Sequence, residues 1–342
     1  MRWIKALSNR PEFDTIFYCL EDYAQKIDYL TTEIKHFKTL WYLLAGRTAA
    51  NKAIRDGCST IVINTFHHIP LLPINKNIRY ISYGDASANQ LTSMSHTKNK
   101  KIPSIIDSIY KYGIRRHANA GMLFLGMSDW YLKSLKDDYL VDEMQLKLLH
   151  TGVDIKIWHP IPSHHKSRKP NEKLRIIMCG TPFKRKGGLL INEISKLKEF
   201  ENCYWDIISF DAEFDNTRNC TYHNNLEPNN SKLVELYQNA DIMLLPTYAD
   251  CSSIAGIEAQ ACGLPLIMTD IGGTNEILSD KITGHLIPNP PTIEKIIKSL
   301  RIYTSNKEIL LRDSIAARKR AENLFSLDSH VQTLISHITN SY

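Results

Sequence analysis

Residues 241–276, DIMLLPTYADCSSIAGIEAQACGLPLIMTDIGGTNE, decide how this chain folds. The apolar run 241–245 stops at Pro246 and predicts a short buried strand. A polar loop then opens into a helical segment, 254–262, and a second apolar run follows at 265–269. A strand, a helix and another strand, with both strands apolar along nearly their whole length, indicate a parallel sheet with helices on both faces.

The same alternation extends upstream of this stretch. Two apolar runs, 174–180 and 204–210, predict strands, and the pattern of residues 188–200 predicts a helix. Ser231 is placed to cap a further helix in SKLVELYQNA. Ligands of such sheets bind beyond the carboxyl ends of the strands, where loops meet the N-termini of helices, so we expect the functional residues there.

The first half of the chain carries weaker patterns. Three short runs, 59–64, 78–82 and 121–125, predict strands, and residues 20–56 are largely helical in pattern. Segment 98–118 mixes six Lys and Arg residues with Ile and Tyr. It predicts either a basic amphipathic helix able to lie on an anionic surface or a domain helix with a solvated basic face.

A length of 342 residues suggests two domains. A polar stretch with three prolines, 159–173, predicts a linker between a first domain, 1–158, and a second, 174–320, with a last segment at 321–342. The composition, 43% hydrophobic and 23% charged, is that of a packed protein without a membrane span. The start lacks a secretory signal and the seven cysteines are scattered, so we expect reduced thiols and a cytoplasmic location.

The net charge of +6 is confined to the first part of the chain. Residues 1–150 hold 20 Lys and Arg against 14 Asp and Glu, whereas residues 151–342 hold 22 of each. A basic half indicates an anionic partner, which is a membrane lipid, a nucleic acid or an acidic acceptor, or else it is a scattered solvated surface.

The loop before helix 254–262 has the chemistry of a binding site. The first helical turn, at Ser253, Ile254 and Ala255, offers backbone N–H groups and the positive end of the helix dipole to an anion. Asp250 and Glu258 are eight residues apart, and carboxylates so placed can bind hydroxyls while the amides hold a phosphate. This combination suits a sugar or ribose joined to a phosphate, although an N-capping Asp and a solvated helical Glu also explain the spacing.

The whole stretch resembles the donor-site signature of the retaining glycosyltransferases of family 4 (group 1). Their pattern has two Glu residues separated by seven others, then Ala-x-Ala-x-Gly-x-Pro, a strand and Gly-Gly-x-x-Glu. Residues 258–265, EAQACGLP, and 272–276, GGTNE, fit this pattern. Asp250 replaces the first Glu, and Ser252 and Ser253 stand where many members have Phe-Gly.

Two further stretches resemble the same family in the expected order. In LLHTGVDIKIWHP, residues 152–154 together with Trp158 and Pro160 match its hinge. In MCGTPFKRKGGLLINEI, Gly180 and the pair 186–187 match its glycine-rich turn followed by Lys-Gly. Thr181 replaces the usual Arg, so we take Lys186 as the first candidate for a diphosphate clamp and Arg185 as the second.

The resemblance implies an α/β fold of two Rossmann-like domains that face each other across a cleft, called GT-B. It implies an acceptor domain at 1–158, a nucleotide-sugar donor domain at 174–320, and a C-terminal helix at 321–342 that packs back on the first domain. The usual first strand with its glycine-rich loop is not recognisable before Gly46, so we expect either that the chain starts after it or that a first strand at 15–20 works without glycines. The resemblance also implies a retaining hexosyltransferase, of class EC 2.4, that needs no metal and uses a nucleotide-diphosphate-sugar as donor.

The resemblance assigns roles residue by residue. It implies catalytic roles for Asp250, Glu258, Lys186 and His67, and donor binding by Gly180, Arg185, Lys186, Ser253, Ile254, Ala255 and Glu258. The basic first domain then indicates a carbohydrate or lipid-linked acceptor and peripheral contact with the inner face of an anionic membrane, in polysaccharide, lipopolysaccharide or glycolipid assembly.

Other functions remain as alternatives. A nucleotide-sugar epimerase would share the fold and donor, and a non-catalytic or weakly active nucleotide-sugar-binding protein would suit the Asp250 and Thr181 replacements. A Rossmann dehydrogenase is disfavoured because no G-x-G-x-x-G follows a first strand. We expect no nucleic-acid partner because no recognisable module accompanies the charge.

Overall fold

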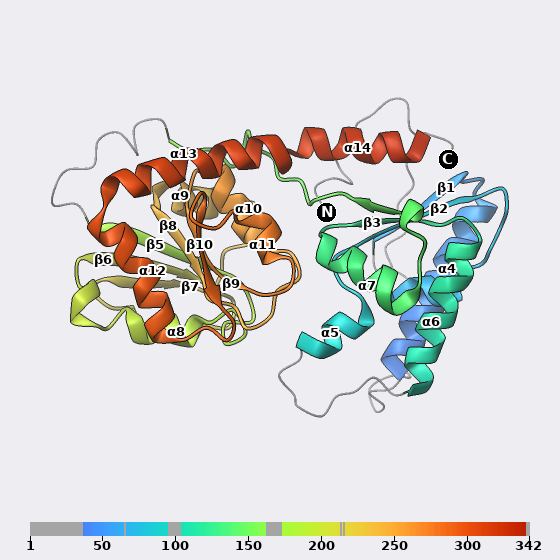
Figure 1. Ribbon diagram of the computed structural model, residues 1–342, viewed down its shortest axis with the longest axis horizontal. Helices are drawn as coiled ribbons and strands as arrows, with labels where there is room; N and C mark the ends of the chain where they lie inside the picture. Colours follow the sequence, from blue (N-terminus) through green and yellow to red (C-terminus); the bar gives the residue numbers. More distant parts are fainter. Residues whose placement is uncertain are drawn as a thin grey trace. The chain divides into compact units, whose positions relative to one another are not determined.

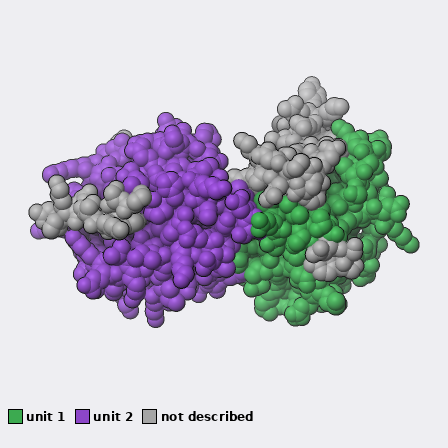
Figure 2. Space-filling model, turned by 90° about the horizontal axis from the view of Figure 1, so that it is seen from above, with its two compact units in different colours: residues 1–150, 331–342 green, residues 151–330 purple. Residues whose placement is uncertain are grey.

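The computed structural model describes residues 37–64, 66–94, 104–161, 173–212, 214 and 216–339. These residues form two compact units (Figure 2). Unit 1 comprises Met1–His150 and Val331–Tyr342, and unit 2 comprises Thr151–His330. Each unit contains one parallel sheet, which confirms the predicted α/β class.

Unit 1 is built on four parallel strands in the order β1-β2-β3-β4. They are β1 (Thr60–Ile63), β2 (Arg79–Gly84), β3 (Leu123–Gly126) and β4 (Leu146–Leu148). The helices between and around them are α4 (Phe37–Arg55), η1 (Phe66–Leu71), α5 (Ala88–Met94), α6 (Ser104–Asn119), α7 (Asp129–Tyr139) and η2 (Glu143–Gln145) (Figure 1). The first three strands were predicted, whereas the three-residue β4 has no apolar run of its own to reveal it.

Both faces of this sheet are apolar. Along β2 and β3, alternate residues such as Tyr80 and Phe124 pack on one face with helices α6 and α7, and their neighbours Ile81 and Leu125 pack on the other. The second face is covered by Leu334, from helix α14 (Leu327–Thr339) at the end of the chain. The first face is therefore covered by helices that lie near these strands in the sequence, whereas the second is covered by helix α14, far away in the sequence.

Unit 2 is built on six parallel strands in the order β10-β9-β8-β5-β6-β7. They are β5 (Leu174–Cys179), β6 (Cys203–Ile208), β7 (Cys220–His223), β8 (Ile242–Leu245), β9 (Leu266–Asp270) and β10 (Gly284–Pro288). The chain adds strands on one side of β5 and then returns to its other side with β8. The switch point of the sheet therefore lies between β5 and β8, where such folds bind their ligands.

The helices of unit 2 pack around this sheet (Figure 1). They are α8 (Gly188–Ile194), η3 (Lys198–Phe200), α9 (Ser231–Asn239), α10 (Ile254–Ala261), α11 (Thr274–Ile277), α12 (Ile293–Ser305) and α13 (Lys307–Leu324). The segment predicted as a single helix over 188–200 is divided into α8 and η3, and at the end of α8 Ser195 Oγ donates to Asn192 O at 3.0 Å. Helix α9 is capped by Asn230 rather than Ser231, since Asn230 Oδ1 accepts from Lys232 N at 2.8 Å.

The hinge segment packs with unit 2. Val153 bridges to Ser326, with its N–H donating to Phe325 O at 2.8 Å. Trp158 is fully buried against the Tyr237 ring of α9. Residues 162–172 of the predicted linker, like 98–103 of the basic segment and 20–36 of the helical one, lie outside the described residues. No helix within the described ranges is both long and apolar enough to span a membrane.

Candidate functional site

The candidate site lies where the loops that follow β5 and β8 meet. Strands β5 and β8 are hydrogen-bonded neighbours, so their carboxyl ends bring loop 180–187 beside loop 246–253. Two backbone contacts join these loops: Tyr248 N donates to Arg185 O at 2.8 Å, and Gly187 adopts a φ of 80° directly against Pro246 O. A side chain at Gly187 would collide with that carbonyl, so glycine permits this close approach.

An ion pair between Lys186 and Asp250 lies at the centre of this junction. Lys186 Nζ is 2.6 Å from Asp250 Oδ2, and the two side chains are only 11% and 8% exposed. Gly180 makes room for it, because a Cβ on Gly180 would lie 3.0–3.2 Å from the aliphatic carbons of Lys186. The structure thus gathers three of the residues that the sequence selected.

Arg185 lies in the same junction but has different partners. Its guanidinium donates to Ala249 O and, at 3.0 Å, to Thr181 O. It therefore braces loop 246–253 against loop 180–187, and its donor groups are directed at backbone carbonyls.

Helix α10 points its N-terminus into the junction. Ser253 is its N-cap and accepts from Gly256 N at 3.2 Å, while Ile254 and Ala255 form the first turn and are partly or largely exposed. The amides of a first helical turn and the positive end of the dipole suit an anion. Since Ser253 is the cap, the reading of Asp250 as a structural N-cap is wrong.

Glu258 follows on α10 and is 6% exposed, so it is not a solvated helical residue either. It lies close to Cys179, Tyr237 and Cys262. Burial raises the pKa of the Cys179 thiol to about 11, and the negative charge of Glu258 contributes to that rise while a Tyr237 hydrogen bond and Lys186 oppose it. Glu258 and Lys186 thus both lie within electrostatic reach of Cys179, the last residue of β5.

The second glycine turn supports the Asp250 loop. Gly272 has a φ of 61° and lies directly against Asp250 O, where a Cβ would collide. Gly273 N donates to Cys251 O at 3.0 Å. The turn 272–273 therefore fixes the backbone that carries Asp250.

Sequence reasoning missed a further support, Asp211. Its carboxylate accepts from Phe183 N at 2.9 and 3.1 Å and from Ser209 Oγ at 2.8 Å. Burial alone would raise its pKa, but these hydrogen bonds and nearby Lys184 hold the pKa below its usual range. The available signal was its position, directly after strand β6 at the carboxyl edge of the sheet.

The remaining predicted residue, His67, lies on η1 of unit 1, and its side chain is outside the described part of the chain. Among the residues that the structure describes, no cluster of His, Cys, Asp or Glu could hold a metal ion.

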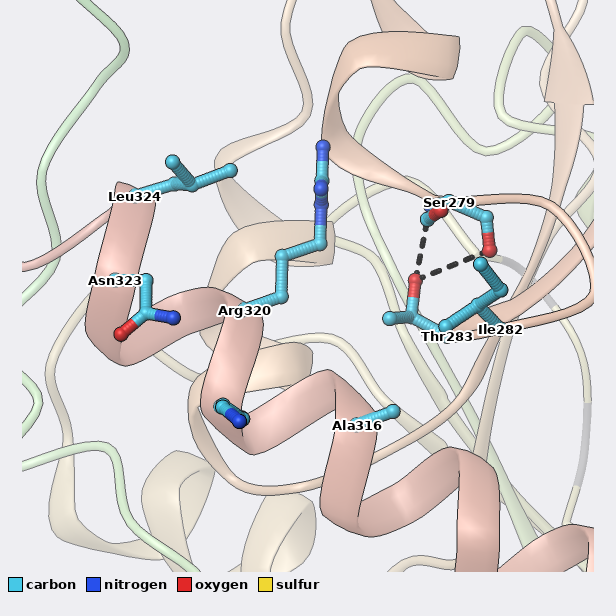
Figure 3. A pocket seen from close by; sticks show the side chains of 8 residues that line it. Ser279, Ile282, Thr283, Ala316, Arg320, Asn323 and Leu324 are labelled. Atoms are coloured by element: carbon cyan, nitrogen blue, oxygen red, sulfur yellow. Dashed lines mark hydrogen bonds between the residues drawn. The ribbon is translucent and has the colours of Figure 1, made fainter.

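A cavity of about 340 Å³ lies elsewhere on unit 2 (Figure 3), between loop 279–283 and helix α13. It shares no lining residue with the loops that carry Lys186 and Asp250. Arg320, on its wall, donates to Glu276 O and Ile277 O at 2.6 and 2.7 Å. Its wall residue Arg320 thus contacts helix α11, which follows the second glycine turn, and the cavity is separate from the candidate site.

These features define an α/β protein with a candidate ligand site at the switch point of a parallel sheet. Residues 163–321 match the family described as Glycosyl transferases group 1. Curated relatives include D-inositol 3-phosphate glycosyltransferases. The one from Mycobacteroides abscessus is 38% identical over 61 residues, which is 18% of this chain and 14% of the relative. The one from Salinispora tropica is 30% identical over 105 residues, which is 30% of this chain and 21% of the relative.

Solved structures resemble nearly the whole chain. Sucrose-phosphate synthase from Thermosynechococcus elongatus has a TM-score of 0.71 at 16% identity, covering 90% of this chain and 80% of its own. WaaG, a glycosyltransferase involved in lipopolysaccharide biosynthesis, has a TM-score of 0.62 at 17% identity, covering 91% and 85%. HepE from Anabaena in complex with UDP has a TM-score of 0.61 at 13% identity, covering 86% and 82%. At these identities the likeness shows the fold, which is GT-B.

Proposed function

We propose that this chain is a retaining glycosyltransferase that moves a sugar from a nucleotide-diphosphate-sugar to an acceptor hydroxyl. The observation that carries the proposal is the grouping of Lys186, Asp250 and Glu258 with the N-terminus of α10 at one switch point. A cation, helix amides and two carboxylates are the groups needed for a ligand that contains both phosphate and hydroxyls.

The parts of the donor are assigned by this chemistry. Its diphosphate would meet Lys186 and the amides at Ser253, Ile254 and Ala255, its ribose hydroxyls would meet Glu258, and the transferred sugar would meet Asp250. We choose Lys186 over Arg185 for the diphosphate because the Arg185 guanidinium is directed at Ala249 O and Thr181 O. Gly180 keeps the space that the Lys186 side chain occupies.

The proposed reaction is same-face displacement at the anomeric carbon. The bond from this carbon to the diphosphate oxygen breaks, the acceptor oxygen forms the new bond, and the acceptor proton passes to the leaving diphosphate. Negative charge grows on the diphosphate as the bond breaks, so Lys186 and the α10 amides stabilise the transition state more than the ground state.

For the acceptor we propose a carbohydrate or a lipid-linked sugar at the inner face of an anionic membrane, in envelope polysaccharide, lipopolysaccharide or glycolipid assembly. Residues 1–150 hold the whole charge surplus. Helix α6 presents large hydrophobic side chains to solvent: Ile105 is 71% exposed and Tyr112 is 72% exposed. Arg115 on the same helix is also exposed. Binding to anionic vesicles at low salt that is lost at high salt would support this acceptor, and absence of binding at low salt would contradict it.

The reaction is tested by variants of the site. A thermal-shift screen of nucleotide-sugars identifies the donor, since a bound ligand raises the apparent stability. Transfer to a panel of acceptors is then measured in Glu258→Ala and Lys186→Ala, which should lose most transfer while keeping the wild-type circular dichroism spectrum. Full activity in either variant would contradict the assignment.

The same assays distinguish the two alternative functions, an epimerase and a non-catalytic binding protein. Conversion of the donor alone into an epimer, followed by NMR, would indicate an epimerase. Donor binding without turnover on any acceptor would indicate a nucleotide-sugar-binding protein.

A further inference from the structure

Asp250, which stands where the family pattern has its first Glu, contacts the Lys186 ammonium. A diphosphate needs the Lys186 ammonium at a fixed point, yet a lysine side chain has four rotatable bonds and a strongly hydrated charge. The Lys186 side chain is 11% exposed, and its ammonium contacts Asp250 Oδ2 at 2.6 Å. The flexible lysine therefore needs a partner that keeps its ammonium in this buried position.

We propose that Asp250 is a positioning residue that holds the Lys186 ammonium in place for the diphosphate, in addition to any contact with the sugar. This inference rests on the proposed function. One N–H of the ammonium is directed at Asp250, and an ammonium has three, so two can reach phosphate oxygens. The hydrogen bond is made through Asp250 Oδ2. In this proposal Oδ1 accepts from a sugar hydroxyl, so that one carboxylate links the two parts of the donor.

The backbone around Asp250 is fixed from three sides. Arg185 donates to Ala249 O, Gly272 lies directly against Asp250 O, and Gly273 N donates to Cys251 O at 3.0 Å. Three consecutive carbonyls of this loop are thus in contact with neighbouring segments. The position of the carboxylate is set by the backbone, and a short side chain transmits that position to the ammonium with little freedom.

The Lys186 side of the contact is fixed as well. Its aliphatic chain lies along Gly180, and the next residue, Gly187, lies against Pro246 O in a left-handed conformation. The neighbouring Arg185 is directed at backbone carbonyls. The ammonium and the carboxylate therefore approach each other from two loops with fixed backbones, as a positioning contact requires.

The test measures binding of a nucleoside diphosphate that carries no sugar. UDP, GDP, ADP and dTDP are screened on the wild type, and the tightest is titrated by calorimetry into four proteins: wild type, Asp250→Asn, Lys186→Met and the double variant. If Asp250 acts through Lys186, Asp250→Asn weakens binding about tenfold in the wild-type background and less than twofold in the Lys186→Met background. Asp250→Glu, which keeps the charge, should recover part of the loss.

Each outcome has a defined meaning. Unchanged binding in Asp250→Asn, or an equal loss in both backgrounds, would overturn the inference, since a residue that contacts only the sugar does not affect the bare diphosphate. Failure of every nucleoside diphosphate to bind the wild type would instead contradict the proposed function. Asp137→Asn is the matched control, because the Lys133–Asp137 pair has the same 2.6 Å separation but is 77% and 49% exposed. Thermal unfolding of each variant separates a loss of fold from a loss of binding.

Discussion

At the scale of single residues, the candidate site depends on glycines that permit backbone contact. Gly272 has a φ of 61° and lies against Asp250 O, whereas Gly121, with a φ of 86°, has nothing within 4 Å of the place where a Cβ would be. An L-residue in this region costs about 1–2 kcal/mol in either case. Alanine variants at these two positions therefore distinguish the cost of backbone strain, common to both, from the cost of losing the contact with Asp250 O.

We predict that Gly272→Ala loses more stability than Gly121→Ala and also weakens nucleoside diphosphate binding. Gly121→Ala should lose about 1–2 kcal/mol and bind as the wild type does. In Gly272→Ala the new methyl displaces the Asp250 loop, so the pair with Lys186 is disturbed. Urea unfolding and calorimetric titration measure both effects, and equal losses in the two variants would show that the contact is unimportant.

His117 predicts a pH dependence of stability. It is 1% exposed in unit 1 beside Tyr80, and burial, helped by the charge of Arg116, lowers its pKa to about 4 from 6.5. The folded state therefore keeps the ring neutral while the unfolded state binds a proton below pH 6.5. The contribution of the neutral His117 ring to the free energy of unfolding is fully present above about pH 6.5. As the pH falls towards 4 this contribution is lost progressively, by about 3 kcal/mol at most.

In His117→Leu the fall in unfolding free energy between pH 7 and pH 4.5 should be smaller than in the wild type. Urea midpoints at the two pH values give the difference. His159→Leu is the control, because His159 is exposed. An identical pH dependence in His117→Leu and wild type would rule out this role.

At the scale of elements, helix α13 holds the far ends of the helices whose near ends face the site. Arg318 donates to Ala261 O at the end of α10 and to Trp158 O at 2.9 Å in the hinge segment. Arg320 donates to the last carbonyls of α11, and Ser314 Oγ donates to Gly263 O at 2.6 Å. Cationic groups at helix C-termini satisfy carbonyls that lack partners within the helix and favour the dipole.

We predict that Arg318→Met destabilises unit 2 by about 2–3 kcal/mol, because its removal leaves partly buried carbonyls without their donor. Arg301→Met is the control, since Arg301 forms a bidentate but solvent-screened pair with Glu199, so its loss should have a much smaller effect on stability. Chemical denaturation of the two variants measures the difference. Comparable losses would mean that the carbonyl contacts of Arg318 add nothing to an ordinary surface ion pair.

Strands β5, β6, β8 and β9 could be predicted because each is an apolar run that ends near a Gly, Pro or polar residue. Strands β7 and β10 were missed, since CTYH and GHLIP are not continuous apolar runs. Lys186, Asp250 and Glu258 could be selected because they follow strand ends in a recognisable order. The contact between Lys186 and Asp250 could not, since 64 residues separate them and only the pairing of β5 with β8 brings them together. Arg318 and Arg320 resemble a solvated basic face in sequence, because their partners are backbone carbonyls, which no side-chain pattern reveals.

At the scale of the whole molecule, unit 1 combines segments that are far apart in the chain. The face of the unit 1 sheet formed by Ile81, Tyr83 and Leu125 is covered by Leu334, with Ile338 packed beside it. Helix α14 begins in unit 2, and its residues from Val331 onward belong to unit 1. Helix α14 therefore completes the core of unit 1, and this packing joins residues more than 200 positions apart.

We predict that Leu334→Ala destabilises unit 1 by about 2–4 kcal/mol and leaves unit 2 unchanged, because a fully buried leucine is removed from a small cluster. Hydrogen exchange reports the two units separately: amides of β2 and β3 should exchange faster, while those of β8 and β9 should keep the wild-type rate. Gln332→Ala, at an exposed position of the same helix, controls for changes in helix stability. Faster exchange in both units would mean that they unfold together, and no change in β2 and β3 would mean that the unit 1 sheet is stable without the C-terminal helix.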